Sequence, residues 1–218
     1  MGMHFKDIKY FEEITDFLEY KTFDGLKLCL IGDLFIRRDL HEVMKHRWVS
    51  KYFQAKGFEV SVIDLGIGTE IVSNTTLKYD LSKPLPEGIG KFDFIVDFGT
   101  AEHILNQYEF NKNMHGLCNV NGVMIRSNPS DTYGGGSAKK HHGYFHYTPN
   151  FYIKLSNSNK YKIVDIREMA QKYWGYGGNT VARRKNFTYV TLLKGADNEF
   201  MSNNQFKIIE GELGDYPK

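Results

Sequence analysis

The sequence of 218 residues predicts one α/β domain, built on a mostly parallel seven-stranded sheet with an antiparallel last strand and helices on both faces. Short apolar runs of strand length alternate with amphipathic helical segments, a pattern typical of parallel strands joined by crossover helices. No helical period separates the last two runs. Because a strand reached through a loop runs antiparallel to its neighbour, we expect the last strand to break the parallel order.

The strands are predicted from apolar runs bounded by turn residues, and they fall at 26–31, 58–63, 92–98, 123–126, 161–166 and 187–193, with residues 77–79 as a further segment too short to be predicted alone. The helices are predicted from apolar residues at helical spacing and from capping signals. An amphipathic helix lies within the N-terminal segment 1–24, and a second begins at Asp39 and ends at Gly57. Two more run from Asn106 to Cys118 and from Thr148 onward, where a proline suits the first helical position.

The domain is expected to cover residues 1–195, with a Gly-rich loop at 168–185 before the last strand. The tail at 196–218 lacks a persistent period. Such a segment is typical either of disorder or of packing against a partner subunit in a homo-oligomer.

Charge and cysteine content narrow the classes of partner. The net charge of +2 and two short basic runs provide no extended positive surface for nucleic acid. Only Cys29 and Cys118 are present, which gives neither a disulfide framework nor a metal knuckle. No signal peptide opens the chain and no apolar run approaches the ~20 residues that span a bilayer. We therefore expect a cytoplasmic protein that acts on a small-molecule substrate.

Acidic residues gather where a ligand is expected. In an open α/β sheet the ligand lies beyond the carboxyl ends of the strands, and here Asp33, Asp64 and Asp80 follow three of those ends. A carboxylate after the second strand can accept hydrogen bonds from both hydroxyls of a ribose, which suits Asp64. Asp80 can accept from the amino group of an adenine. Any one aspartate is equally well explained as a turn residue.

Four segments resemble class I S-adenosylmethionine-dependent methyltransferases, whose fold is Rossmann-like. Residues 79–86 (YDLSKPLP) and 92–103 (FDFIVDFGTAEH) are similar to the segments after the third strand and across the fourth. Residues 121–125 (NGVMI) resemble the entry into the fifth strand. Residues 142–149 (HGYFHYTP) resemble a segment of bacterial members that act on small molecules or sugars. The resemblance runs roughly from Leu26 to Leu193.

The resemblance implies S-adenosylmethionine as cofactor and a methyl group as the transferred unit. The implied cofactor-binding residues are Gly32, Asp33, Asp64, Asp80, Leu81, Phe98 and Gly99. Within this set Asp64 binds the ribose, Asp80 and Leu81 contact the adenine, and Phe98 and Gly99 line the methionine side together with Glu102. The chain departs from the family at the turn after the first strand, where several glycines are usual and only Gly32 is present.

Methyl transfer from a sulfonium depends mainly on positioning, and an acceptor hydroxyl or amine also needs a base. The candidate base is His103 or His142, with Glu102 holding cofactor or substrate, although His103 is equally well explained as a hydrogen-bonded residue at a helix start. The candidate substrate-binding residues are Tyr144, His146, Tyr147, Trp174 and Tyr176. Aromatic rings in such a pocket suit a sugar ring or a flat heterocycle.

A metal site is the alternative interpretation of the histidines. His142 and His146 have helical spacing, but Gly143 disfavours a helix between them and no cysteine is nearby, so no metal is predicted.

The leading hypothesis is a methyltransferase for a small polar acceptor, such as a sugar or glycan precursor. The alternative is a non-catalytic domain that kept the fold and lost the cofactor through its altered first turn. A nucleic-acid methyltransferase is disfavoured because the fourth strand leads into Asp97-Phe98-Gly99-Thr100 instead of an Asn/Asp-Pro-Pro-aromatic motif. An NAD-dependent enzyme is disfavoured because the first turn lacks G-x-G-x-x-G.

Overall fold

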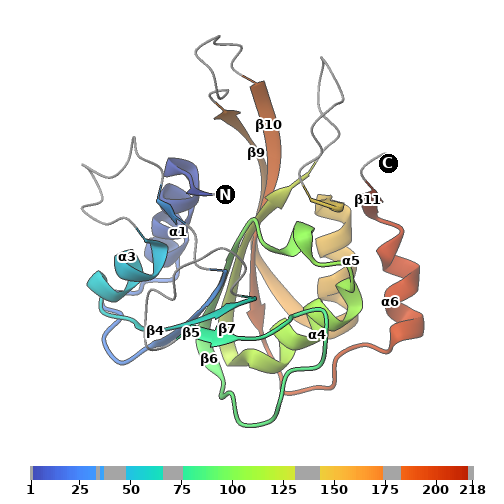
Figure 1. Cartoon of the computed structure of the whole chain (residues 1–218), viewed down its shortest axis with the longest axis horizontal. Helices are drawn as coiled ribbons and strands as arrows, with labels where there is room; N and C mark the ends of the chain where they lie inside the picture. Colours follow the sequence, from blue (N-terminus) through green and yellow to red (C-terminus); the bar gives the residue numbers. More distant parts are fainter. Residues whose placement is uncertain are drawn as a thin grey trace.

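A seven-stranded sheet forms the centre of the computed structural model, in the order β5-β4-β2-β6-β7-β10-β9 (Figure 1). The structure describes residues 2–32, 35–36, 48–65, 76–130, 143–173 and 183–215. The strands of the sheet are β2 (Lys27–Ile31), β4 (Glu59–Asp64), β5 (Thr76–Lys78), β6 (Phe92–Phe98), β7 (Cys118–Pro129), β9 (Tyr161–Tyr173) and β10 (Arg183–Lys194).

The strand directions confirm the predicted fold class. From β5 to β7 every neighbouring pair is parallel, whereas β10 is antiparallel to both β7 and β9. The last strand of the sheet in chain order is therefore the antiparallel one, and it lies between β7 and β9. At the centre, Leu30 pairs with Val62 on one side and with Val96 on the other. These residues are fully buried, as expected for strands covered on both faces.

Helices cover both faces of this sheet (Figure 1). They are α1 (Phe5–Phe17) and α3 (Val49–Ala55) on one face, and α4 (Gln107–Leu117), α5 (Pro149–Asn159) and α6 (Asn203–Glu210) on the other. Phe11 and Phe94 belong to the buried cluster under α1 and α3, and Phe110 and Phe206 belong to the cluster on the opposite face. Burying apolar surface on both faces is what holds the helices on the sheet.

Local capping explains where two of these helices begin. The side chain of Asn106 accepts a hydrogen bond from the Glu109 backbone N–H, at 3.1 Å, at the start of α4. Thr148 accepts one from Phe151 in the same way, and Pro149 occupies the first turn of α5. The predicted start of the second helix, Asp39, lies outside the described residues; in the described part of the chain α3 begins at Val49, after an extended Trp48, and ends just before Gly57.

The hairpin of β9 and β10 is longer than predicted. The prediction ended the sixth strand at residue 166 and began the seventh at 187, with a Gly-rich loop between them, but pairing continues from Glu168 with Thr188 to Tyr173 with Arg183. The outer part of the hairpin carries mostly polar residues, so it gives no apolar run, and backbone hydrogen bonds to the partner strand hold it.

Two pairs of short strands and one 3-10 turn lie outside the main sheet in the described part of the chain. β1 (Gly2–Met3) pairs parallel with β3 (Phe35–Ile36), β8 (Phe145–Tyr147) pairs antiparallel with β11 (Leu213–Asp215), and η1 (Ala101–His103) is a 3-10 turn after β6. Sequence periodicity predicted none of them, because two or three residues are too few to show a period. Their pairings join segments that are distant in the sequence.

The C-terminal segment is folded onto the domain up to residue 215, where a tail without a persistent period was expected. Phe206 and Ile209 of α6 are buried against the α4 and α5 face, and Leu213 of β11 is buried beside them. An eight-residue helix with two buried positions shows too little periodicity to be recognised. In the described part of the chain, no helix has both the length and the apolar character needed to cross a membrane.

Candidate functional site

The carboxyl ends of the parallel strands meet at one edge of the sheet, where the ligand of such a fold is expected (Figure 1). Gly32 follows β2, Asp64 ends β4, Gly99 follows β6, and β7 ends at Pro129. The structure therefore brings the predicted cofactor residues of β2, β4 and β6 to neighbouring positions on this edge. The side chains at the ends of β6 and β7 form a connected polar cluster there.

The turn after β2 is formed around Gly32. Its φ of 75° lies in the left-handed region that glycine adopts without strain. The Gly32 N–H donates to the Ile63 carbonyl at 2.8 Å, and a Cβ at this position would lie 2.6 Å from the Thr100 hydroxyl oxygen. A side chain larger than hydrogen is therefore excluded both by backbone conformation and by contact with Thr100.

The turn after β6 is held by the buried carboxylate of Asp97. Its Oδ1 accepts from the backbone N–H groups of Thr100, at 3.0 Å, and of Ala101, at 3.3 Å. Gly99, which lies between Asp97 and Thr100 in the chain, has a φ of 83°. A carboxylate that accepts two successive N–H groups fixes the path of the turn, so the backbone of Gly99 is presented at the sheet edge in one conformation.

Two residues of β7 complete the interactions of Asp97. The buried Arg126 donates from Nε to Asp97 Oδ2 at 3.3 Å, and its guanidinium lies 5.1 to 5.3 Å from the ring centres of Phe110, Tyr147 and Tyr152. The Asn128 amide donates to Asp97 Oδ2 and to Glu102 Oε2, at 3.2 Å each. Sequence reasoning did not select Arg126 or Asn128 as site residues. The signal that could have indicated Arg126 is its place directly after the apolar run 123–125 of a predicted central strand.

Glu102 and His103 lie next to each other at the start of the segment after β6. Glu102 is fully buried, and this burial, with the nearby charge of Asp97, raises its pKa to about 8. Burial lowers the pKa of His103, whose ring is 41% exposed and lies with Nε2 at 4.0 Å from Glu102 Oε1. At neutral pH the pair therefore consists of a protonated acid and a neutral imidazole, and a neutral imidazole can accept a proton.

The segment before β8 packs directly over Glu102. The Tyr144 N–H donates to the Glu102 carbonyl at 2.6 Å, and a Cβ on Gly143 would lie 2.6 Å from Glu102 Cγ. Tyr144 is 51% exposed, and it is joined to Glu102 through its backbone N–H. The structure thus brings three of the predicted catalytic and substrate-binding residues together.

The other two described substrate-binding candidates are interior residues. His146 and Tyr147 of β8 are buried, and the Tyr147 hydroxyl donates to Gln107 Oε1. A direct contact of Tyr147 with an acceptor would require this hydrogen bond to break. In the present arrangement its ring instead forms one wall of the aromatic cage around Arg126.

The other predicted cofactor residues, on the adenine, methionine and ribose sides, are partly engaged in contacts within the protein. Asp80 Oδ1 accepts from the Ser82 N–H at 3.0 Å and from the Ser82 hydroxyl at 2.6 Å, and these hydrogen bonds lower the pKa of Asp80. Leu81 and Phe98 have buried side chains within the two cores, so any cofactor contact would involve their backbone. Asp64 is half-buried at the end of β4.

Four predicted site residues, Asp33, His142, Trp174 and Tyr176, lie outside the described residues. Within the described ranges, no three His, Cys, Asp or Glu side chains are grouped so that they could hold a metal ion.

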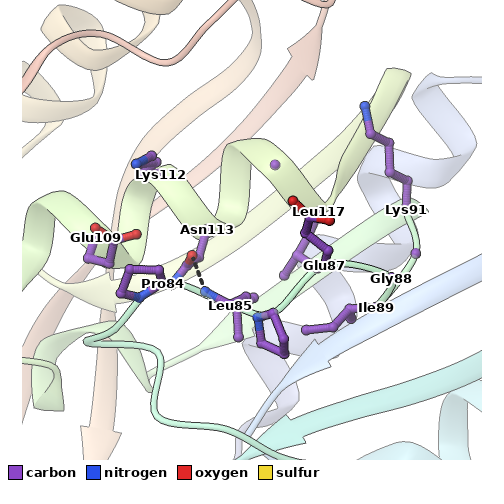
Figure 2. Close-up of a pocket in the computed structure, with 13 residues that line it drawn as sticks. Pro84, Leu85, Glu87, Gly88, Ile89, Lys91, Glu109, Lys112, Asn113 and Leu117 are labelled. Carbon is purple, nitrogen blue, oxygen red and sulfur yellow. Dashed lines mark hydrogen bonds between the residues drawn. The ribbon is translucent and has the colours of Figure 1, made fainter.

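A surface cavity of about 560 Å³ lies elsewhere, between the loop at 84–91 and α4 (Figure 2). Its wall includes Pro84, Leu85 and Ile89 from the loop and Glu109 and Lys112 from α4. Because this loop leads into the amino end of β6, the cavity belongs to the opposite end of that strand from Gly99.

Comparison with known proteins gives a consistent fold. No protein-family model and no curated protein sequence matches the chain. Among solved structures, TehB from Haemophilus influenzae superposes with a TM-score of 0.56 at 14% identity, over 84% of this chain and 62% of TehB. The MccD protein gives 0.56 at 13% identity, over 84% of this chain and 97% of MccD.

A third similar structure contains ligands. It is the 1,6-didemethyltoxoflavin-N1-methyltransferase of Burkholderia thailandensis, with bound 1,6-didemethyltoxoflavin and S-adenosylhomocysteine; its TM-score is 0.53 at 14% identity, over 85% of this chain and 76% of the enzyme. At these identities the likeness establishes the fold. The chain therefore has the Rossmann-like fold of class I S-adenosylmethionine-dependent methyltransferases, as the sequence predicted.

Proposed function

We propose that this protein is an S-adenosylmethionine-dependent methyltransferase that acts on a small polar acceptor. The observation that carries the proposal is the sheet order, with the antiparallel β10 between β7 and β9, combined with a buried acid and a histidine at the carboxyl edge. The similar structure from Burkholderia thailandensis holds S-adenosylhomocysteine, the product of such a reaction, which supports this choice of cofactor.

The described residues fit the cofactor at its predicted position. Gly32 and Gly99 both have left-handed backbone just after the adjacent strands β2 and β6, so each of these two positions offers backbone without a side chain. Asp64, at the end of the next strand, would hold the ribose hydroxyls. When bound, S-adenosylmethionine supplies a methyl group already activated on a sulfonium, so the protein's task is to orient the acceptor and remove its proton.

His103 would remove that proton from an acceptor hydroxyl or amine. Its partly exposed ring and lowered pKa favour the neutral form that accepts a proton. Tyr144, an exposed aromatic residue whose backbone contacts Glu102, would supply a ring for the acceptor. Together with the predicted contributions of Trp174 and Tyr176, this ring favours a sugar, a glycan precursor or a flat heterocycle as acceptor.

Calorimetric titration of the purified protein with S-adenosylmethionine and S-adenosylhomocysteine tests the proposal. We expect saturable heat with both ligands and a dissociation constant raised about tenfold or more in Asp64→Ala, because the ribose hydroxyls would lose their acceptor. Asp16→Ala, which removes an exposed carboxylate of α1, is the matched control and should bind like the wild type. Absence of heat and of thermal stabilisation at millimolar ligand would overturn the proposal.

A non-catalytic role is the second candidate, and one observation favours it. The described turn after β2 contains one glycine where the methyltransferase family usually has several, and Gly32 is closely contacted by Thr100. The same titration separates the two candidates, since a domain that has lost the cofactor gives no signal with either ligand.

A further inference from the structure

The turn after β2 and the turn after β6 are joined by one side chain. The Thr100 hydroxyl donates to the Ile31 carbonyl at 2.8 Å, which connects residues 69 positions apart in the sequence. We infer that Thr100 is a positioning residue that sets the shape of the cofactor-binding turn at Gly32. The inference rests on the proposed function, because it concerns the same cofactor site.

The contact is close enough to define the turn. Ile31 is fully buried at the end of β2. Thr100 Oγ1 lies so close to Gly32 that a Cβ on this residue would be only 2.6 Å from it. The Ile31 carbonyl and the Gly32 N–H belong to the same peptide group: the carbonyl accepts from Thr100, and the N–H donates to the Ile63 carbonyl on β4 at 2.8 Å. The peptide between β2 and the turn is therefore fixed from both neighbouring strands.

Thr100 is itself held rigidly. Its backbone N–H donates to Asp97 Oδ1 at 3.0 Å, and the other carboxylate oxygen of Asp97 is held by Arg126 and Asn128. All three of these side chains are buried. The hydrogen bond from Thr100 to the Ile31 carbonyl thus connects the turn after β2 to a buried polar network. Hydrogen bonds inside such a network restrict motion more than exposed ones do.

This arrangement gives a physical reason why one glycine can be sufficient. A turn rich in glycine adopts the required conformation through backbone freedom, whereas a turn with other residues needs an external constraint. The Thr100 hydroxyl supplies that constraint from the adjacent strand. Removing the hydroxyl should therefore raise the dissociation constant of the cofactor by loosening the turn. This rise should be larger than in a variant that loses a similar amount of stability elsewhere in the protein.

The test is calorimetric titration of the full chain with S-adenosylhomocysteine, combined with thermal unfolding, in three variants. Thr100→Val removes the hydroxyl at nearly constant volume, and Thr100→Ser keeps it. Thr191→Val is the matched control, because Thr191 is a buried β10 threonine whose hydroxyl is hydrogen-bonded to Tyr10 at 2.9 Å on the α1 face. Thr100→Ala serves as a second hydroxyl-free variant if the valine variant does not fold.

We expect Thr100→Val to raise the dissociation constant about three- to tenfold, the equivalent of one hydrogen bond, with Thr100→Ser close to wild type. Thr191→Val should lower the unfolding temperature comparably and leave the dissociation constant unchanged. If every folded Thr100 variant binds S-adenosylhomocysteine with the same dissociation constant as the wild type, the inference is overturned and the proposed function still stands. Failure of the wild type to bind at all would overturn the proposed function itself.

Discussion

The polar side chains at the carboxyl edge gain their properties from burial. Asp97, Arg126 and Asn128 are each at most 1% exposed, and each has hydrogen-bond partners within the same cluster. Removing one member leaves the others buried without a partner, which is much more costly than removing an exposed charge. This cluster therefore combines two roles at the residue level, since it stabilises the sheet edge and fixes the turns of the proposed cofactor site.

Glu102 should make stability depend on pH. Its pKa is raised to about 8 by burial and by Asp97, so between its unfolded pKa near 4.5 and pH 8 the folded state holds a proton that the unfolded state releases. Its contribution is complete below the unfolded pKa and is lost as pH rises through 8. Glu102→Gln removes this titration while keeping a neutral side chain of the same shape.

We expect the difference in unfolding free energy between Glu102→Gln and the wild type to shift in favour of the variant from pH 5 to pH 8, by at most about 1.4 kcal/mol per pH unit. Urea unfolding of both proteins at several pH values measures it. Other titrating groups are common to both proteins and cancel in the difference. Parallel stability curves over this range would show that Glu102 is ionised in the folded protein.

At the scale of the elements, α4 holds the loop that follows β5. The buried amide of Asn113 donates to the carbonyls of Leu81, at 3.1 Å, and Lys83, at 2.8 Å. Its oxygen accepts from the Leu85 N–H at 3.3 Å, the hydrogen bond drawn in Figure 2. One side chain thus fixes the loop that carries the predicted adenine contacts and forms one wall of the surface cavity.

Asn113→Ala should therefore lower the free energy of unfolding by about 1 to 3 kcal/mol, because buried backbone groups lose their partner. In a protein of this size that corresponds to a fall in unfolding temperature of several degrees. Asn119→Ala is the control, since the Asn119 amide donates only one hydrogen bond among those found here, to Asp93 at 2.8 Å. Thermal unfolding compares the two, and an equal effect would contradict the role assigned to Asn113.

Across the whole molecule, the sequence predicted best what is buried on both faces. The strand Phe92–Phe98 is found with the predicted bounds because it is central and five of its seven residues are apolar. The outer hairpin at 168–173 and 183–186 was missed because its pairing uses backbone groups and leaves no apolar pattern. The network around Arg126 was missed for a related reason, since its hydrogen-bond partners Asp97 on β6 and Asn111 on α4 are brought to it only by the fold.

The predicted site divides in the same way. Positions adjacent to strand ends, such as Gly32, Asp64 and Glu102, could be placed at the carboxyl edge from strand order alone. Whether a side chain there is exposed could not be derived, because burial depends on segments that arrive from elsewhere. Tyr144 and Tyr147 illustrate this, since they lie only three positions apart in the sequence, and one is exposed while the other is enclosed by α4 and α5.

The C-terminal segment shows how much of the molecule depends on contacts that sequence periodicity does not reveal. Phe206 of α6 is fully buried and contacts the rings of Tyr108 and Phe151, whereas Ile208, two residues later, is 77% exposed. Phe206→Ala should therefore cost about 3 to 5 kcal/mol, and Ile208→Ala should stay within about 0.5 kcal/mol of wild type. Urea unfolding measures both on the same helix. Equal stability of the two variants would mean that α6 is not part of the cooperative fold, whereas the expected contrast would extend the folding unit from the N-terminal helix to β11.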